Sequence, residues 1–178
     1  EKSRGFTLDN ASDETELEYV RISGAEKDYG GGMYLSSSNP TLINSIIWDN
    51  SPESIYLYSD VQPIITYSDI EGGWEGEGNI DIDPLFTDPD NGDYTLQPTS
   101  PCIDAGTAFF ELDGEVIIDL DESEYIGIAP DMGAYEFIFI DCLNSGDVNN
   151  DYQINVIDVL AVVCQILQYD DCDIYCNS

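Results

Sequence analysis

The chain has 178 residues, of which 37 are Asp or Glu and four are Lys or Arg, giving a formal net charge of −33 with no histidine. Because nucleic-acid binding and attachment to anionic membranes both need basic side chains, this composition argues against both kinds of partner. Without histidine the chain cannot form a Ser-His-Asp or Cys-His catalytic site or a histidine zinc site, and no apolar run approaches the roughly 20 residues of a membrane-spanning helix.

A repeat runs through the first half of the chain. Residues 33–47 align with residues 55–70 after a shift of 22 or 23 positions. The matched pairs are Tyr34/Tyr56, Leu35/Leu57, Pro40/Pro63, Leu42/Ile65, Ser45/Ser68 and Ile47/Ile70. A weaker copy, offset by 25 positions, places Leu17, Val20 and Ile22 under Leu42, Ser45 and Ile47.

The length and composition of this repeat predict a mainly β solenoid. Each copy contains two or three short apolar strands separated by Gly, Asn, Ser and Pro, and it lacks the Leu-x-x-Leu-x-Leu pattern of leucine-rich repeats. Successive coils of such a fold stack about 4.8 Å apart and pair their strands in parallel. We expect similar residues to stack inside the coil, in the pairs Leu35/Leu57, Leu42/Ile65 and Ile47/Ile70.

The period breaks after residue 70, where the turn-rich stretch 72–78 begins. Because the last coil of a solenoid exposes unpaired strand edges, an atypical terminal unit has to cover it. We therefore predict three parts: β-helix coils over 1–75, an irregular β cap of the solenoid over 76–140, and a small tail over 141–178.

Several short motifs add a resemblance to a known family. They are Asn-Pro-Thr-Leu-Ile-Asn-Ser-Ile-Ile-Trp-Asp-Asn (39–50), Tyr-Ser-Asp-Ile-Glu-Gly-Gly (67–73), Gly-Asn-Ile-Asp-Ile-Asp-Pro-Leu-Phe (78–86), Ser-Pro-Cys-Ile-Asp-Ala-Gly (100–106) and Pro-Asp-Met-Gly-Ala-Tyr-Glu-Phe (130–137). In this order the chain resembles the C-terminal part of secreted bacterial right-handed parallel β-helix proteins, the pectate-lyase-like repeat proteins. The resemblance implies a right-handed parallel β-helix in a secreted, extracellular or cell-surface protein. It implies no single function, because that superfamily includes lyases, glycosidases, adhesins and inert stalks.

Residues 147–158 carry a calcium-binding motif. Oxygen donors occur at alternate positions and again at the twelfth, as in an EF-hand-type loop. The predicted ligands are Asp147, Asn149, Asp151, the carbonyl oxygen of Gln153, Asn155 and Asp158. Alternate spacing turns these donors toward one hard cation, and magnesium is less suitable because it prefers fewer protein ligands. Calcium is therefore the predicted cofactor, against the alternative of an acidic turn that merely precedes a helix.

The loop resembles a dockerin repeat, because Asp158 ends it and Asn155 stands at its ninth position. Residues 156–169, which follow the loop, are helical by their apolar period. The chain departs from the dockerin pattern in two places: Tyr152 replaces the glycine of the sharp turn, and one repeat is legible where cellulosomal dockerins carry two. The resemblance implies an EF-hand-like loop-helix module whose protein partner is a cohesin-like domain or another copy of this chain.

The cysteines indicate an oxidising compartment. Four of the five, Cys142, Cys164, Cys172 and Cys176, lie in the last 37 residues, a clustering that favours two disulfides. A zinc site built from four cysteines is the rival interpretation, but no two of these cysteines are separated by two residues, as in the usual zinc knuckle. The disulfide pairing stays open among three possibilities. We expect Cys102 to be a buried small hydrophobic residue.

No catalytic residues are predicted. β-Helix lyases commonly need a basic residue near the abstracted proton, and Arg21 is the only one inside the repeats. A glycosidase needs two carboxylates at a set separation, whereas Asp69 has Ile46 as its equivalent one coil earlier. Trp48 and Trp74 could stack on a sugar, which makes a polysaccharide a further candidate partner, although packing on the coil is the more common role of such residues.

Two functions remain. The first is structural: a secreted β-helix that serves as a scaffold, an adhesin or a filament subunit, with a calcium-stabilised tail that docks to a partner or to the next copy. An open-ended solenoid supports this function, because its first coil can receive another β-coil. The alternative is the C-terminal fragment of a polysaccharide-degrading enzyme that is anchored through a dockerin–cohesin interaction.

Overall fold

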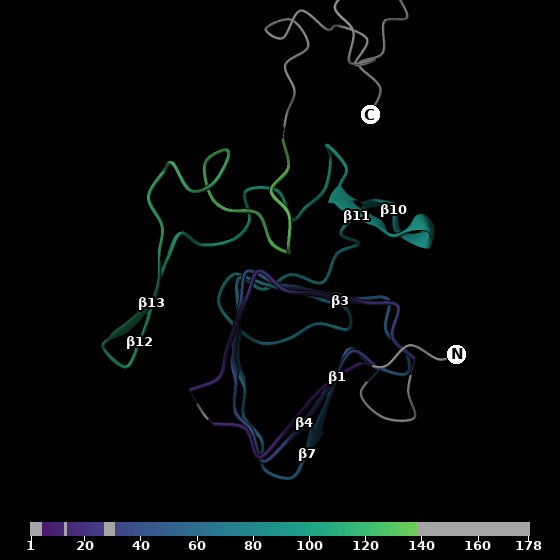
Figure 1. Cartoon of the computed structure of the whole chain (residues 1–178), viewed down its shortest axis with the longest axis vertical. Helices are drawn as coiled ribbons and strands as arrows, with labels where there is room; N and C mark the ends of the chain where they lie inside the picture. Colours follow the sequence, from purple (N-terminus) through teal and green to yellow (C-terminus); the bar gives the residue numbers. More distant parts are fainter. Residues whose placement is uncertain (1–4, 13, 27–30, 139–178) are drawn as a thin grey trace, which may run out of the picture. The chain divides into compact units, whose positions relative to one another are not determined.

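The structure is a computed structural model, and it describes residues 5–12, 14–26 and 31–138. Within these residues the chain is mainly β (Figure 1). The elements are β1 (Phe6–Asp9), β2 (Glu16–Glu18), β3 (Arg21–Ser23), β4 (Met33–Ser36), β5 (Thr41–Ile43), β6 (Ile46–Trp48), β7 (Ile55–Tyr58), β8 (Ile64–Thr66), β9 (Asp69–Ile70), β10 (Phe86–Asp88), the short 3-10 helix η1 (Pro89–Asn91), β11 (Asp93–Leu96), β12 (Phe109–Leu112) and β13 (Glu115–Asp119). All described residues except Ile138 belong to one compact unit, Glu1–Phe137.

The first nine strands form three parallel sheets. Each sheet takes one strand from each of three successive coils, in the orders β1-β4-β7, β2-β5-β8 and β3-β6-β9. In Figure 1 the strands β1, β4 and β7 lie nearly one behind another, and successive coils follow nearly the same outline. Because neighbours along the chain belong to different sheets, the arrangement is compatible with a solenoid.

The pairing register confirms the predicted repeat. The paired residues of the second and third coils are Tyr34/Tyr56, Leu35/Leu57, Leu42/Ile65 and Ile47/Ile70. The weaker first copy is also a coil, since Leu17 pairs with Leu42 and Ile22 pairs with Ile47. Similar residues stack on the outside as well, where the rings of Tyr34 and Tyr56 lie 5.5 Å apart at an interplanar angle of 13°.

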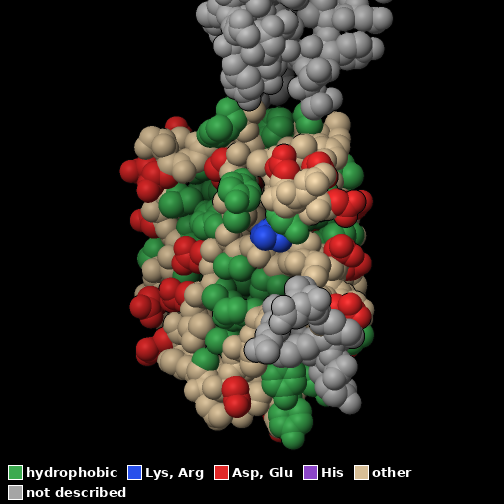
Figure 2. Space-filling view, turned by 45° about the vertical axis from the view of Figure 1, so that its right-hand side comes forward, with side chains coloured by type: hydrophobic (Ala, Val, Ile, Leu, Met, Phe, Trp, Pro, Cys, Tyr) green, Lys and Arg blue, Asp and Glu red, His purple; other side chains and the backbone are tan. Residues whose placement is uncertain are grey.

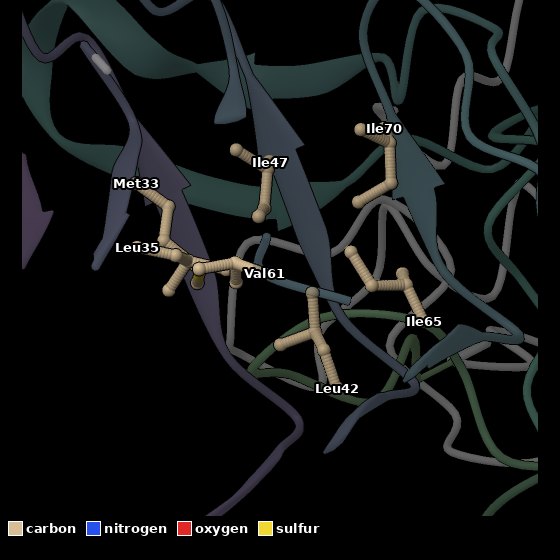
Figure 3. Close-up of a cluster of buried hydrophobic side chains, with 7 residues drawn as sticks. All are labelled: Met33, Leu35, Leu42, Ile47, Val61, Ile65 and Ile70. Atoms are coloured by element: carbon tan, nitrogen blue, oxygen red, sulfur yellow. The ribbon is translucent and has the colours of Figure 1, made fainter. Parts of the chain in front are cut away.

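The apolar core lies inside the coils. Its buried members point toward one another in Figure 3 and are Met33, Leu35, Leu42, Ile47, Val61, Ile65 and Ile70. None of these side chains is more than 6% exposed, and burial of one such side chain contributes about 1.5–3 kcal/mol. The predicted inward pairs are therefore confirmed. Trp74, from the stretch after the third coil, also packs against this core.

A left-handed residue follows each of the nine coil strands. These positive-φ positions are Asn10, Tyr19, Gly24, Ser37, Asn44, Asp49, Ser59, Tyr67 and Gly72. They recur at equivalent places in every coil, so each coil turns three corners with the same backbone conformation. Seven of them are not glycine, and each such residue costs about 1–3 kcal/mol that the surrounding packing must offset.

Side chains of the next coil bind the backbone just after each corner. Between the first and second coils, the N–H groups of Ala11, Val20 and Ala25 donate to Ser38 Oγ at 2.9 Å, Ser45 Oγ at 3.1 Å and Asn50 Oδ1 at 3.0 Å. The second of these contacts recurs in later coils, where Ser45 N donates to Ser68 Oγ and Ser68 N donates to Asn79 Oδ1. We call these contacts the corner caps. They give partners to N–H groups that a bend would otherwise leave unpaired.

Residues 77–80 lie against the third coil. Tyr67 N donates to the Glu77 carbonyl at 2.7 Å, Ile70 N donates to the Ile80 carbonyl at 3.0 Å, and Asp69 forms a parallel bridge with Ile80. This short stretch therefore continues the sheets where the repeat ends.

Residues 84–137, here called the lateral segment, do not add strands to the three parallel sheets. They carry the antiparallel hairpins β10–β11 and β12–β13 and pack against the outer face of the sheet β3-β6-β9. Ile46 points outward from β6 and forms a second buried cluster with Leu96, Cys102 and Met132, with Trp48 packed beside it. The outward apolar residues of β6 explain this packing, because they need a cover that the coil itself does not supply.

Candidate functional site

The outer face of β3-β6-β9 holds the buried polar side chains that are candidates for chemistry. Because Ile22, Ile47 and Ile70 point inward, their neighbours point outward and form a column across the three coils. Arg21 pairs with Ile46, and Ile46 pairs with Asp69. The column thus places a cation, an apolar residue and an acid side by side under the lateral segment.

Asp69 is fully buried at one end of this column. Its Oδ2 accepts a hydrogen bond from Cys102 Sγ at 3.3 Å, and its Oδ1 accepts one from Ile82 N at 3.3 Å. Burial raises the pKa of the Asp69 carboxyl from 3.8 to about 6, and these two hydrogen bonds offset only part of that rise. A thiol donor and one long amide contact do not replace the water that the carboxylate loses.

Cys102 is buried as predicted, but it is also the hydrogen-bond donor to Asp69. Burial, followed by the nearby charge of Asp69, raises the pKa of the Cys102 thiol. A thiol that stays protonated at neutral pH is a poor nucleophile. The Asp69–Cys102 pair therefore acts as a structural contact between the third coil and the lateral segment.

Two other carboxylates hold the lateral segment to itself. Asp131 is buried, and its two oxygens accept hydrogen bonds from Asp104 N and Phe137 N. Asp104 Oδ1 in turn accepts from Ile128 N at 2.8 Å and from Ala129 N at 3.3 Å. Burial raises the pKa of Asp131, and the backbone N–H donors lower it in part. These contacts close loops within the lateral segment.

Asn44 joins the second coil to the lateral segment. It occupies a left-handed corner with φ of 50°, a conformation that Asn tolerates better than most residues. Its Nδ2 donates to the Thr107 carbonyl at 2.9 Å, and its Oδ1 accepts from Thr107 N at 2.8 Å. Gly133 N donates to the Asn44 carbonyl at 2.8 Å. One buried residue therefore binds two separate parts of the lateral segment.

Replacing Asn44 with Ala should lower the free energy of unfolding by about 2 kcal/mol, because both backbone groups of Thr107 lose their partner. Urea unfolding followed by tryptophan fluorescence measures the change. The exposed Asn91, whose side chain donates a hydrogen bond to Asp88 Oδ2 at 2.7 Å, is the matched control, and Asn91→Ala should cost less than about 0.5 kcal/mol. Equal effects of the two substitutions would contradict the role given to Asn44.

Arg21 connects the lateral segment to the first coil. Its guanidinium carbon lies 3.5 Å from the ring centroid of Tyr94 in β11, a cation–π contact. Arg21 is the one Lys or Arg within the described ranges 5–12, 14–26 and 31–138. On the face of the molecule that Figure 2 presents, basic atoms lie next to hydrophobic side chains. The basic residue that a lyase would need is thus stacked on an aromatic ring. Together with the contacts of Asn44 and Asp69, this contact joins the lateral segment to all three coils.

The predicted metal site lies elsewhere in the chain. Asp147, Asn149, Asp151, Gln153, Asn155 and Asp158 are outside the described residues, as are the helix predicted over 156–169 and the four clustered cysteines. In the part of the chain that the structure describes, no group of three or more Cys, Asp or Glu side chains is arranged to hold a metal ion. No helix there is long and apolar enough to cross a membrane.

Sequence reasoning missed the polar contacts of the lateral segment. An acid at Asp69, in a column where the previous coil has Ile46, was a partial signal that this outward position is covered. No comparable signal linked Asn44 with Thr107, because 63 positions separate them. Trp48 and Trp74, considered as a sugar-stacking face, pack against different clusters: Trp74 against the core inside the coils and Trp48 against the cluster around Ile46.

Comparison of the chain with protein-family models, with curated proteins and with solved structures finds no match.

Proposed function

We propose that the chain is a secreted structural module. It forms the end of a right-handed parallel β-helix that serves as a scaffold, an adhesin or a filament subunit. A calcium-binding, dockerin-like tail over 141–178 docks to a cohesin-like partner or to another copy of the chain. The observation that carries this proposal is the repetition of the corner caps at all three bends of the coil. A stack whose coils meet through repeated contacts can be lengthened without new chemistry.

The first coil offers a surface for such lengthening. Within the described residues, β2 and β3 are edge strands that pair with β5 and β6. Leu17 and Ile22, which point inward from them, are only partly buried, whereas their partners Leu42 and Ile47 are fully buried. Another β-coil, from the same chain or from a second copy, would cover these residues and pair the strand edges.

The charge of the chain fits a calcium-dependent role. A net charge of −33 produces strong self-repulsion unless cations bind. Figure 2 shows acidic side chains along both sides of the face that it presents. The six predicted ligands of the tail supply oxygen atoms only, which is the donor set that calcium prefers.

Calcium should raise the free energy of unfolding by about 2.7 kcal/mol at one hundred times its Kd, and EDTA should reverse the gain. Thermal unfolding and light scattering of the full chain, with and without calcium, measure stability and assembly together. A variant that combines Asp147→Asn with Asp158→Asn should lose the gain. The control combines Asp170→Asn with Asp171→Asn, which changes the charge equally outside the loop, and it should keep the gain.

The same samples separate the forms of the proposal from the alternative. Growth into oligomers or fibres with calcium would favour self-assembly, and a calcium-bound monomer would favour docking to a cohesin-like partner. The absence of any calcium effect in the unaltered chain would contradict the predicted loop. Cleavage of a polysaccharide by the purified chain, measured as new reducing ends or unsaturated products, would favour the fragment of a polysaccharide-degrading enzyme instead.

A further inference from the structure

Three tyrosines lie together on the outer face of the sheet β1-β4-β7. Tyr34 belongs to β4, and Tyr56 and Tyr58 belong to β7, the next strand of the sheet. Because Leu35 and Leu57 pack into the core, the tyrosines that alternate with them along each strand point outward. We call these three residues the tyrosine cluster. Nothing in the proposed scaffold role uses it.

The rings of the tyrosine cluster are close together and nearly parallel. The ring centroids of Tyr34 and Tyr56 lie 5.5 Å apart at an interplanar angle of 13°, and those of Tyr34 and Tyr58 lie 6.3 Å apart at 22°. Burial raises the pKa of the Tyr34 phenol, and the nearby phenols of Tyr58 and Tyr56 raise it further. The oxygen-bearing ends of the rings are therefore neighbours. Tyr58 is 54% exposed, so a small oxidant in solution can reach the cluster.

Neighbouring phenols of this kind are suited to oxidative coupling. A one-electron oxidant takes an electron from a phenol, whose proton passes to solvent, and leaves a radical that is shared with the ring carbons next to the oxygen. Two such radicals join through these carbons, and the hydrogen on each joined carbon then moves to oxygen and restores the phenol. With hydrogen peroxide as the final oxidant, two tyrosines and one peroxide give one dityrosine and two water molecules.

We propose that the tyrosine cluster is a site of oxidative cross-linking, at which a peroxide-driven one-electron oxidation joins Tyr34 covalently to a tyrosine of β7. Strand pairing already holds Tyr34 beside Tyr56, so the two rings meet without a search through solution. The bond would connect the second coil to the third across 22 or 24 positions of the chain. Its formation depends on the ring contacts alone and requires neither the calcium loop nor a partner protein.

Treatment of the full chain with a haem peroxidase and hydrogen peroxide, at low protein concentration, tests the proposal. Monomers are then isolated by size and digested with Glu-C, which cleaves after Glu53, between Tyr34 and the tyrosines of β7. Mass spectrometry should find the two peptides joined with the loss of two hydrogen atoms. The cross-linked monomer should also unfold at a higher urea concentration, because the bond restricts the unfolded chain as a disulfide does. Oxidised monomers without the joined peptides would overturn the proposal.

Two variants test the residues. Tyr34→Phe keeps the ring, so the stack and the fold should be retained, but it removes the phenol and should abolish the link between β4 and β7. Tyr135, which lies in the lateral segment and is 55% exposed, is the matched control, and Tyr135→Phe should leave the link unchanged. An undiminished yield of dityrosine in Tyr34→Phe monomers, or an equal loss in Tyr135→Phe monomers, would overturn the assignment to the tyrosine cluster.

Discussion

Replacing Ile47 with Ala should lower the free energy of unfolding by about 2–5 kcal/mol, the largest effect expected of any single substitution in the coils. Ile47 is fully buried at the middle rung of its column, between Ile22 and Ile70. The shortened side chain would leave a cavity that neither neighbouring coil can fill, because the strands on both sides are fixed by pairing. Urea unfolding followed by circular dichroism measures the loss.

The matched control for this prediction is Ile64 in β8. Its side chain is 39% exposed, and it occurs in a strand of the same coil stack. Ile64→Ala should therefore cost less than about 1 kcal/mol. If both substitutions had the same cost, the inward column of Ile22, Ile47 and Ile70 would not be the core of the protein.

Asp69→Asn should remove about 3 kcal/mol of pH dependence from the stability of the chain. The folded state raises the pKa of Asp69 to about 6, above its ordinary value of 3.8. Protonation of this group therefore favours the folded state. The resulting stabilisation is fully present below about pH 4 and is lost as the pH rises through about 6.

The measurement compares urea unfolding of both forms from about pH 3.5 to pH 7.5. The stability of the unaltered chain should fall by about 3 kcal/mol more than that of Asp69→Asn over this range. Asp131 and Glu18, whose pKa values are also raised, act in the same direction but remain in both proteins. The exposed Asp90, replaced by Asn, is the control with the same change of charge. A profile for Asp69→Asn parallel to the original would show that Asp69 is not held in a buried, poorly solvated site.

The coils could be predicted from the sequence because each coil repeats the same inward residues and the same contacts at its corners. The three inward columns that the repeat predicted carry Leu or Ile in every copy, so a match such as Leu42 with Ile65 gives both the face and the register. The corners are similarly local, since Ser45 and Ser68 bind the backbone of the preceding coil at the same place. A shift of 22 or 23 residues in the printed sequence therefore corresponds to one rung of the stack.

The lateral segment could not be predicted in this way. Its contacts with the coils join residues that no period relates, such as Asn44 with Thr107 and Asp69 with Cys102. Each depends on the shape of a single loop and on the burial of a single polar group. Residues 77–80 lie against the third coil, as the prediction of a terminal cover requires, but the packing of residues 84–137 on the side of β3-β6-β9 had no counterpart in the sequence pattern.

The proposed lengthening of the β-helix rests on the stacking of the coils, and NMR tests that stacking most directly. In a parallel stack, NOEs between amide and Hα protons should join β4 with β7, β5 with β8 and β6 with β9, at sequence separations of 22 or 23 residues. Strands that follow one another along the chain, such as β4 and β5, should show no backbone NOEs between them. Strong Hα–Hα NOEs between β4 and β5 would instead indicate an antiparallel hairpin and would contradict the stacked coils.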